Sequence, residues 1–107
     1  MTLAIDFDYT IHDNAHPVPG RKMGPPMPGA KEALELFKRH GHEIIIHSCN
    51  NPRVIRDWML YWQVPFDSIW TEPGKPIADF YIDDRAFRFT SWSQTLEDII
   101  ANQAGQL

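Results

Sequence analysis

Short apolar segments alternate with amphipathic segments along this chain, and that alternation restricts the folds it can adopt. Three apolar runs, at residues 2–7, 43–47 and 77–82, are too short for buried helices and match buried strands. Helical patterns follow the runs, at residues 28–41, 51–63 and from residue 91 onwards. Strands that alternate with helices pair in parallel through right-handed crossovers. We therefore expect an α/β fold with a small parallel sheet and helices on both faces, in three layers.

Residues with a known physical role at helix ends mark the starts of these helices. Pro28 suits a first helical turn, where its missing backbone N–H would have no partner. Asn51 followed by Pro52 is a typical N-cap and first helical position. Ser91 and Gln94 have the spacing of a capping box. The three helices are thus supported by their ends as well as by their periodicity.

Length and composition indicate one globular domain over residues 1–107. The net charge of -4 and the absence of a Lys/Arg-rich run exclude a broad nucleic-acid footprint, but they leave a nucleotide or a polynucleotide end open as a ligand. A single cysteine forms no internal disulfide, and no leader or long apolar span is visible. We therefore expect a cytoplasmic protein without membrane contact. The sequence does not determine whether it forms an oligomer.

Each apolar run delivers a polar side chain where it ends. Asp6 follows Leu3-Ala4-Ile5 in the first run, Ser48 follows the second run, and Asp83 with Asp84 follows the third. The carboxyl ends of parallel strands line the ligand crevice of an open sheet, so these groups should converge in space. Three more polar residues lie close to these positions in the sequence: Asp8, Thr10 and Lys75.

Several carboxylates in one crevice repel one another unless a cation lies among them. Oxygen ligands without a cysteine cluster favour Mg²⁺, which binds one or two carboxylates, water and a substrate phosphate. Asp6 is ionised at neutral pH and can attack phosphorus without a base if the metal and Lys75 neutralise the phosphoryl oxygens. The product of that attack is an aspartyl-phosphate.

These residues form four motifs that resemble those of the haloacid dehalogenase (HAD) superfamily of phosphohydrolases. The motifs are Asp6-Phe7-Asp8-Tyr9-Thr10, Ser48, Gly74-Lys75-Pro76 and Asp83-Asp84, in the family's order. The resemblance spans most of the chain and implies a Rossmann-like, HAD-like fold. It also implies a Mg²⁺-dependent phosphatase, a hydrolase of phosphate monoesters that acts through an aspartyl-phosphate.

The resemblance implies a role for each motif residue. Asp6 matches the nucleophile, and Asp8 matches the general acid/base, whose backbone carbonyl also binds the metal. The phosphoryl group would be contacted by Thr10, Ser48 and Lys75. The metal site would comprise Asp6, Asp8, Asp83 and Asp84.

Tyr9 departs from the family pattern, which commonly has glycine at this position. An aromatic ring there is expected to cover part of the pocket without removing a catalytic group. The gaps between motifs leave no room for a cap domain, so the chain resembles the capless class.

Access to a capless site should depend on the long segment after the first strand. That Pro/Gly-rich loop, over residues 11–27, has no periodicity, and loops of this length in small domains usually carry function. We expect it to lie over the active site, where His12 and His16 are candidate substrate contacts together with Arg21 and Lys22. Arg53, at the start of the second helix, is a further candidate.

Two other interpretations of the sequence compete with the phosphatase hypothesis. One is a non-catalytic metal- or phosphate-binding module on a HAD-like scaffold, and the other is a receiver-like signalling domain. Receiver domains place an adjacent acidic pair after the first strand, whereas Asp6 and Asp8 are separated by one residue. The sequence does not select a substrate among sugar phosphates, nucleotides, polynucleotide 3′-phosphate ends and phosphoproteins.

Overall fold

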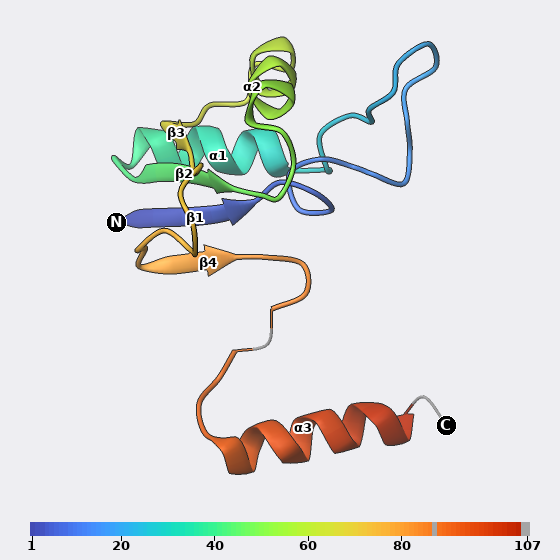
Figure 1. Ribbon diagram of the computed structural model, residues 1–107, viewed down its shortest axis with the longest axis vertical. Helices are drawn as coiled ribbons and strands as arrows, with labels where there is room; N and C mark the ends of the chain where they lie inside the picture. The colour runs from blue at the N-terminus through green and yellow to red at the C-terminus, as the bar shows by residue number, and fades with distance from the viewer. Residues whose placement is uncertain (87, 106–107) are drawn as a thin grey trace.

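A four-stranded parallel sheet organises the protein, whose computed structural model describes residues 1–86 and 88–105 (Figure 1). The strands lie in the order β3-β2-β1-β4, so β1 is central and β4 forms one edge. The expected α/β fold with a parallel sheet and flanking helices is confirmed. The elements are β1 (Thr2–Asp6), α1 (Ala30–Arg39), β2 (Glu43–His47), α2 (Pro52–Tyr61), β3 (Ser68–Ile69), β4 (Phe80–Ile82) and α3 (Trp92–Gly105).

Element boundaries differ from the expected ones where the backbone requires it. The first helix begins two residues after Pro28, because Gly29 has a left-handed φ of 82° that no α-helical residue adopts. The second helix ends before Gln63, whose φ of 55° is also left-handed. β4 begins at Phe80, three residues after the start of the apolar run at residues 77–82, and pairs with β1 from Leu3 onwards.

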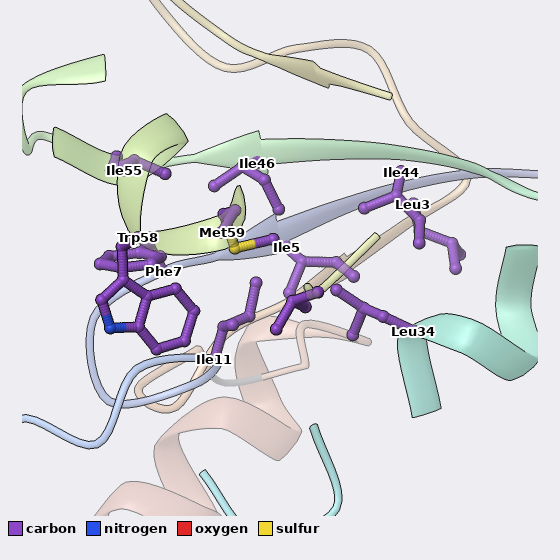
Figure 2. Close-up of a cluster of buried hydrophobic side chains, with 11 residues drawn as sticks. Leu3, Ile5, Phe7, Ile11, Leu34, Ile44, Ile46, Ile55, Trp58 and Met59 are labelled. Atoms are coloured by element: carbon purple, nitrogen blue, oxygen red, sulfur yellow. The ribbon is translucent and has the colours of Figure 1, made fainter. Parts of the chain in front are cut away.

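The core lies on one face of the sheet, beneath α1 and α2 (Figure 2). Side chains alternate between the faces of a strand, so Leu3 and Ile5 of β1 share a face with their partners Ile44 and Ile46 of β2. All four are buried. The helices complete the cluster with Leu34 from α1 and with Ile55, Trp58 and Met59 from α2.

The opposite face is crossed by the connection from β3 to β4, residues 70–79. Ala4 and its partner Tyr81 lie on this face, and the Tyr81 hydroxyl donates to the carbonyl of Pro76 at 2.6 Å. Pro76 is fully buried. An irregular segment therefore covers β1 where the alternation of elements would suggest a helix.

α3 lies beyond β4, apart from the sheet (Figure 1). Ser91 caps its start, as expected, by accepting from the Gln94 amide at 3.1 Å. Its apolar residues Trp92, Leu96 and Ile100 are exposed, and the core cluster contains no residue of this helix. None of the helices among the described residues has the length and apolar character needed to cross a membrane.

Candidate functional site: an acidic cavity at the sheet edge

Three carboxyl groups meet where β1 and β4 end. Asp6 is the last residue of β1, and Asp83 and Asp84 directly follow β4, its neighbour in the sheet. One oxygen from each side chain lies within 4.8 Å of the others. The acidic cavity at this point has a volume of about 320 Å³ and is lined by Asp6, Asp8, Tyr9, Asp83, Asp84 and Arg85. The parallel register thus brings together motif residues that are far apart in the sequence.

The local environment works against the ionised form of Asp6. Burial raises the pKa of Asp6 to about 6, and the neighbouring Asp83 carboxylate contributes next, followed by Asp84 and Asp8. The Phe7 backbone opposes this rise through a hydrogen bond to the carboxylate. Ionised Asp6 at neutral pH therefore costs free energy that a nearby positive charge would recover.

The donor set fits a hard divalent cation. Three carboxylate oxygens at these separations provide the ligand type that Mg²⁺ prefers, with space in the cavity for water or a phosphate oxygen. The carboxylate of Asp8 lines the cavity but does not belong to the group of three. The direct side-chain ligands would therefore be Asp6, Asp83 and Asp84.

The raised pKa of Asp6 predicts a pH-dependent difference between wild type and Asp6→Asn. Between about pH 4 and pH 6 the native carboxyl holds a proton that the unfolded chain has released, so rising pH destabilises the wild type. After allowance for solvent screening we expect Asp6→Asn to be more stable than wild type by about 1 kcal/mol at pH 7 in EDTA, and equally stable near pH 4. Denaturant unfolding at both pH values measures the difference. A difference that does not change with pH would contradict the electrostatic account.

Asp8 is held by a ring of hydrogen-bond donors. Asn14 donates from Nδ2 to Asp8 Oδ1 at 3.0 Å, and Ser48 Oγ lies 3.4 Å from Oδ2. Asn50 Nδ2 lies 3.4 Å from Oδ2, and its backbone amide donates to the Ser48 hydroxyl at 3.0 Å. These donors orient the carboxylate of Asp8 where it lines the acidic cavity.

Tyr9 forms a tight turn between Asp8 and the loop. Its φ is 62°, in the left-handed region that favours glycine, so the turn persists although the residue is not glycine. The Tyr9 amide donates to Asn14 Oδ1 at 2.8 Å and to the His12 carbonyl at 3.0 Å, which holds the backbone in place. The ring is half exposed and lines the cavity, as expected from the sequence.

Backbone strain at Tyr9 predicts different stabilities for two small substitutions. Tyr9→Gly and Tyr9→Ala both remove the ring, but alanine keeps the Cβ that opposes a left-handed φ. We expect the glycine variant to be the more stable of the two by about 1 kcal/mol in denaturant unfolding, because the left-handed conformation costs that much for an L-residue. A more stable alanine variant would show that the turn relaxes when the ring is removed.

Several sequence-derived candidates lie outside the acidic cavity. Lys75 is exposed, with its ammonium 5.8 Å from the centre of the Tyr81 ring, and it does not line the cavity. The Thr10 hydroxyl is buried and has no hydrogen-bond partner within the described part of the chain. Arg53 is exposed in the first turn of α2. Neither Lys75 nor Thr10 therefore lines the cavity in which a phosphate would bind next to Asp6.

The loop over residues 11–27 divides into parts with different surroundings. His12 is 5% exposed and packs in the interior. His16 is exposed and pairs with Asp13, its Nδ1 lying 2.9 Å from a carboxylate oxygen. Arg21 and Lys22 line a second cavity, of about 420 Å³, between the loop and α2. No residue of the loop lines the acidic cavity, so the expectation that the loop covers the site is wrong for the cavity itself. The loop reaches the site through Asn14, which contacts Asp8.

Sequence reasoning did not identify three residues that belong to the site. Asn14 and Asn50 contact Asp8, and Arg85 lines the cavity with its Nε 3.7 Å from Asp84 Oδ2. Arg85 could have been found from its place directly after the acidic pair. Asn50 could have been found from its position two residues after Ser48, whereas Asn14 has no such sequence context.

Comparison with known proteins supports the fold. No family model matches the chain, and no curated protein matches it significantly. The chain is similar to a solved structure described as the conserved protein coded by a locus from Bacteroides thetaiotaomicron. The identity is 26% and the TM-score 0.63, over 95% of this chain and 91% of that chain. The likeness extends over nearly the whole α/β arrangement, and the neighbour's description names no activity.

Proposed function

We propose that the protein is a Mg²⁺-dependent phosphomonoester hydrolase of the capless HAD type. The observation that supports this most directly is the meeting of Asp6, Asp83 and Asp84 at one sheet edge, with Asp8 alongside in the same cavity. A bound divalent cation would supply charge neutralisation for these carboxylates and for a phosphoryl group. The substrate would be a phosphorylated small molecule, a nucleotide or a polynucleotide end, in a cytoplasmic setting.

In the first chemical step, a carboxylate oxygen of Asp6 forms a bond to phosphorus. The bond from phosphorus to the ester oxygen breaks, and that oxygen takes a proton from Asp8. The ring of donors from Asn14, Ser48 and Asn50 keeps Asp8 beside the cavity for this transfer. Arg85 provides a cation at the cavity wall that can pair with phosphoryl oxygens.

In the second step, the aspartyl-phosphate is hydrolysed. Asp8 takes a proton from water, the water oxygen bonds to phosphorus, and the bond from phosphorus to Asp6 breaks. Phosphate leaves and both carboxyl groups return to their starting states. Since Asp8 gives a proton in one step and takes one in the next, it needs a fixed orientation toward the reacting phosphorus.

A phosphate-release screen with Mg²⁺ tests the proposal. Sugar phosphates, nucleotides, oligonucleotides with 3′-phosphate ends and phosphopeptides should be compared, each with Mg²⁺ and with EDTA. We expect release from at least one class that EDTA abolishes. Tight Mg²⁺ binding without release from any class would favour the non-catalytic binding module.

A further inference from the structure

His12 occupies an unusual position for a histidine on a long loop. Its side chain is almost completely buried, stacked on Phe7 at 5.2 Å between ring centres and in edge contact with Trp58 at 5.6 Å. Phe7 and Trp58 themselves form part of the core (Figure 2). The ring is therefore fixed by packing on two sides.

Hydrogen bonds from Gly24 determine which ring nitrogen carries the proton. The Gly24 backbone amide donates to His12 Nε2 at 2.9 Å, and the Gly24 carbonyl accepts from Trp58 Nε1 at 2.9 Å. A backbone N–H is always a donor, so Nε2 must be unprotonated. The neutral imidazole therefore carries its proton on Nδ1.

The backbone of Asp13 packs so closely against residue 24 that only glycine fits there. A Cβ at residue 24 would lie 2.0 Å from the carbonyl oxygen of Asp13, so no other residue fits without a shift of the loop. This contact fixes Gly24, and Gly24 in turn fixes the tautomer and the orientation of His12.

The Nδ1–H of His12 faces the proposed acid/base. His12 Nδ1 is buried and makes no hydrogen bond within the described part of the chain, and Asp8 Oδ1 lies 3.5 Å from it. A buried donor without a partner costs free energy, and a small movement of the Asp8 side chain toward His12 would satisfy it. The other donors to Asp8 come from Asn14, Ser48 and Asn50, and none of these three residues is buried.

We propose that His12 is a positioning residue for Asp8, holding the carboxyl group in the orientation needed for proton transfer to the leaving oxygen. This inference rests on the proposed phosphatase function and goes beyond it by assigning a second residue to the acid/base. His12 acts through Asp8 and does not touch the substrate, in contrast to its expected role as a substrate contact on the loop.

Two substrates with different leaving groups distinguish positioning from packing. An alkyl phosphate needs a proton on its leaving oxygen, whereas a nitrophenyl phosphate does not, because nitrophenolate is a stable anion. For His12→Phe, which keeps the stacked ring, we expect kcat/KM to fall at least about tenfold for the alkyl ester and less than about threefold for the nitrophenyl ester. The ratio of the two values is independent of the fraction of folded enzyme. His40→Phe, which changes an exposed histidine at the end of α1 and outside the acidic cavity, is the matched control and should change neither value.

Different outcomes identify different failures. An equal fall for both esters in His12→Phe would show that His12 only packs, and the positioning role would be wrong while the phosphatase function stands. Wild type that hydrolyses neither ester, nor any class in the phosphate-release screen, would overturn the proposed function, and the role of His12 with it. ¹⁵N NMR of the wild-type imidazole gives a test without activity: a proton on Nε2 would overturn the proposal even if the variant fails to fold.

Discussion

Asp6→Asn should lose phosphate release almost completely while the protein stays folded. The amide has the shape of the carboxylate but cannot form the covalent bond to phosphorus, so the covalent route is closed. We expect kcat to fall by at least about 10³-fold, equivalent to about 4 kcal/mol or more in the activation barrier. Phosphate release measured with saturating Mg²⁺ gives the change, and circular dichroism checks the fold.

A second aspartate provides the control for this substitution. Asp57 lies exposed on α2 and outside the acidic cavity, so Asp57→Asn makes the same chemical change without touching the proposed nucleophile. Its activity should match wild type within about twofold. If Asp6→Asn keeps near wild-type turnover, the aspartyl-phosphate mechanism is wrong, even if the site still binds Mg²⁺.

Asp83→Asn should weaken metal binding and activity together. Asp83 Oδ1 accepts from the Arg85 amide at 2.8 Å, and an asparagine oxygen can keep that bond while the negative charge is lost. We expect Mg²⁺ affinity to fall by about tenfold or more and phosphate release at limiting Mg²⁺ to fall about 10²-fold, with partial recovery at high Mg²⁺. Calorimetric titration measures the affinity independently of turnover.

A second substitution at Asp83 distinguishes the loss of a metal ligand from the loss of a structural hydrogen bond. Asp83→Ala removes both the charge and the bond to Arg85, so the difference between the two variants measures the contribution of that bond, and the difference between Asp83→Asn and wild type measures the contribution of the charge. Asp79→Asn, close to the opposite end of β4, serves as a control that should bind Mg²⁺ like wild type. Unchanged Mg²⁺ affinity in Asp83→Asn would place the cation elsewhere.

The meeting of distant carboxylates was predictable because it follows from the sheet. A parallel sheet places the carboxyl ends of its strands at the same edge, so the apolar runs predict that Asp6 and Asp83 lie close together. The direct pairing of β1 with β4 was not predicted from the sequence. The helix ends were predictable within two or three residues from proline, asparagine and serine. Left-handed residues such as Gly29 and Gln63 shifted those ends, and φ at a given residue depends on the tertiary contacts around it.

Contacts made by loops could not be predicted in the same way. Asn14 reaches Asp8 because the turn at Tyr9 reverses the chain, and no periodicity in the sequence encodes that reversal. The burial of His12 depends on Gly24, twelve residues later in the loop. Lys75 lies on the connection between β3 and β4, whose path across the sheet depends on the burial of Pro76. Such positions are set by packing and not by the local pattern.

The separation of α3 from the sheet divides the chain into regions of unequal resistance to hydrogen exchange. A helix of 14 residues whose apolar side chains Trp92, Leu96 and Ile100 are exposed and outside the core cluster is only marginally stable in water, so its amides open through local fraying. The amides of β1 and β2 are hydrogen-bonded within the sheet, and these strands contribute side chains to the buried core. Their amides therefore exchange only when the whole domain unfolds. Cleavage after Arg85 or Arg88 would therefore remove a segment that contributes little to the cooperative unit, and would leave the strands that carry the carboxylates as that unit.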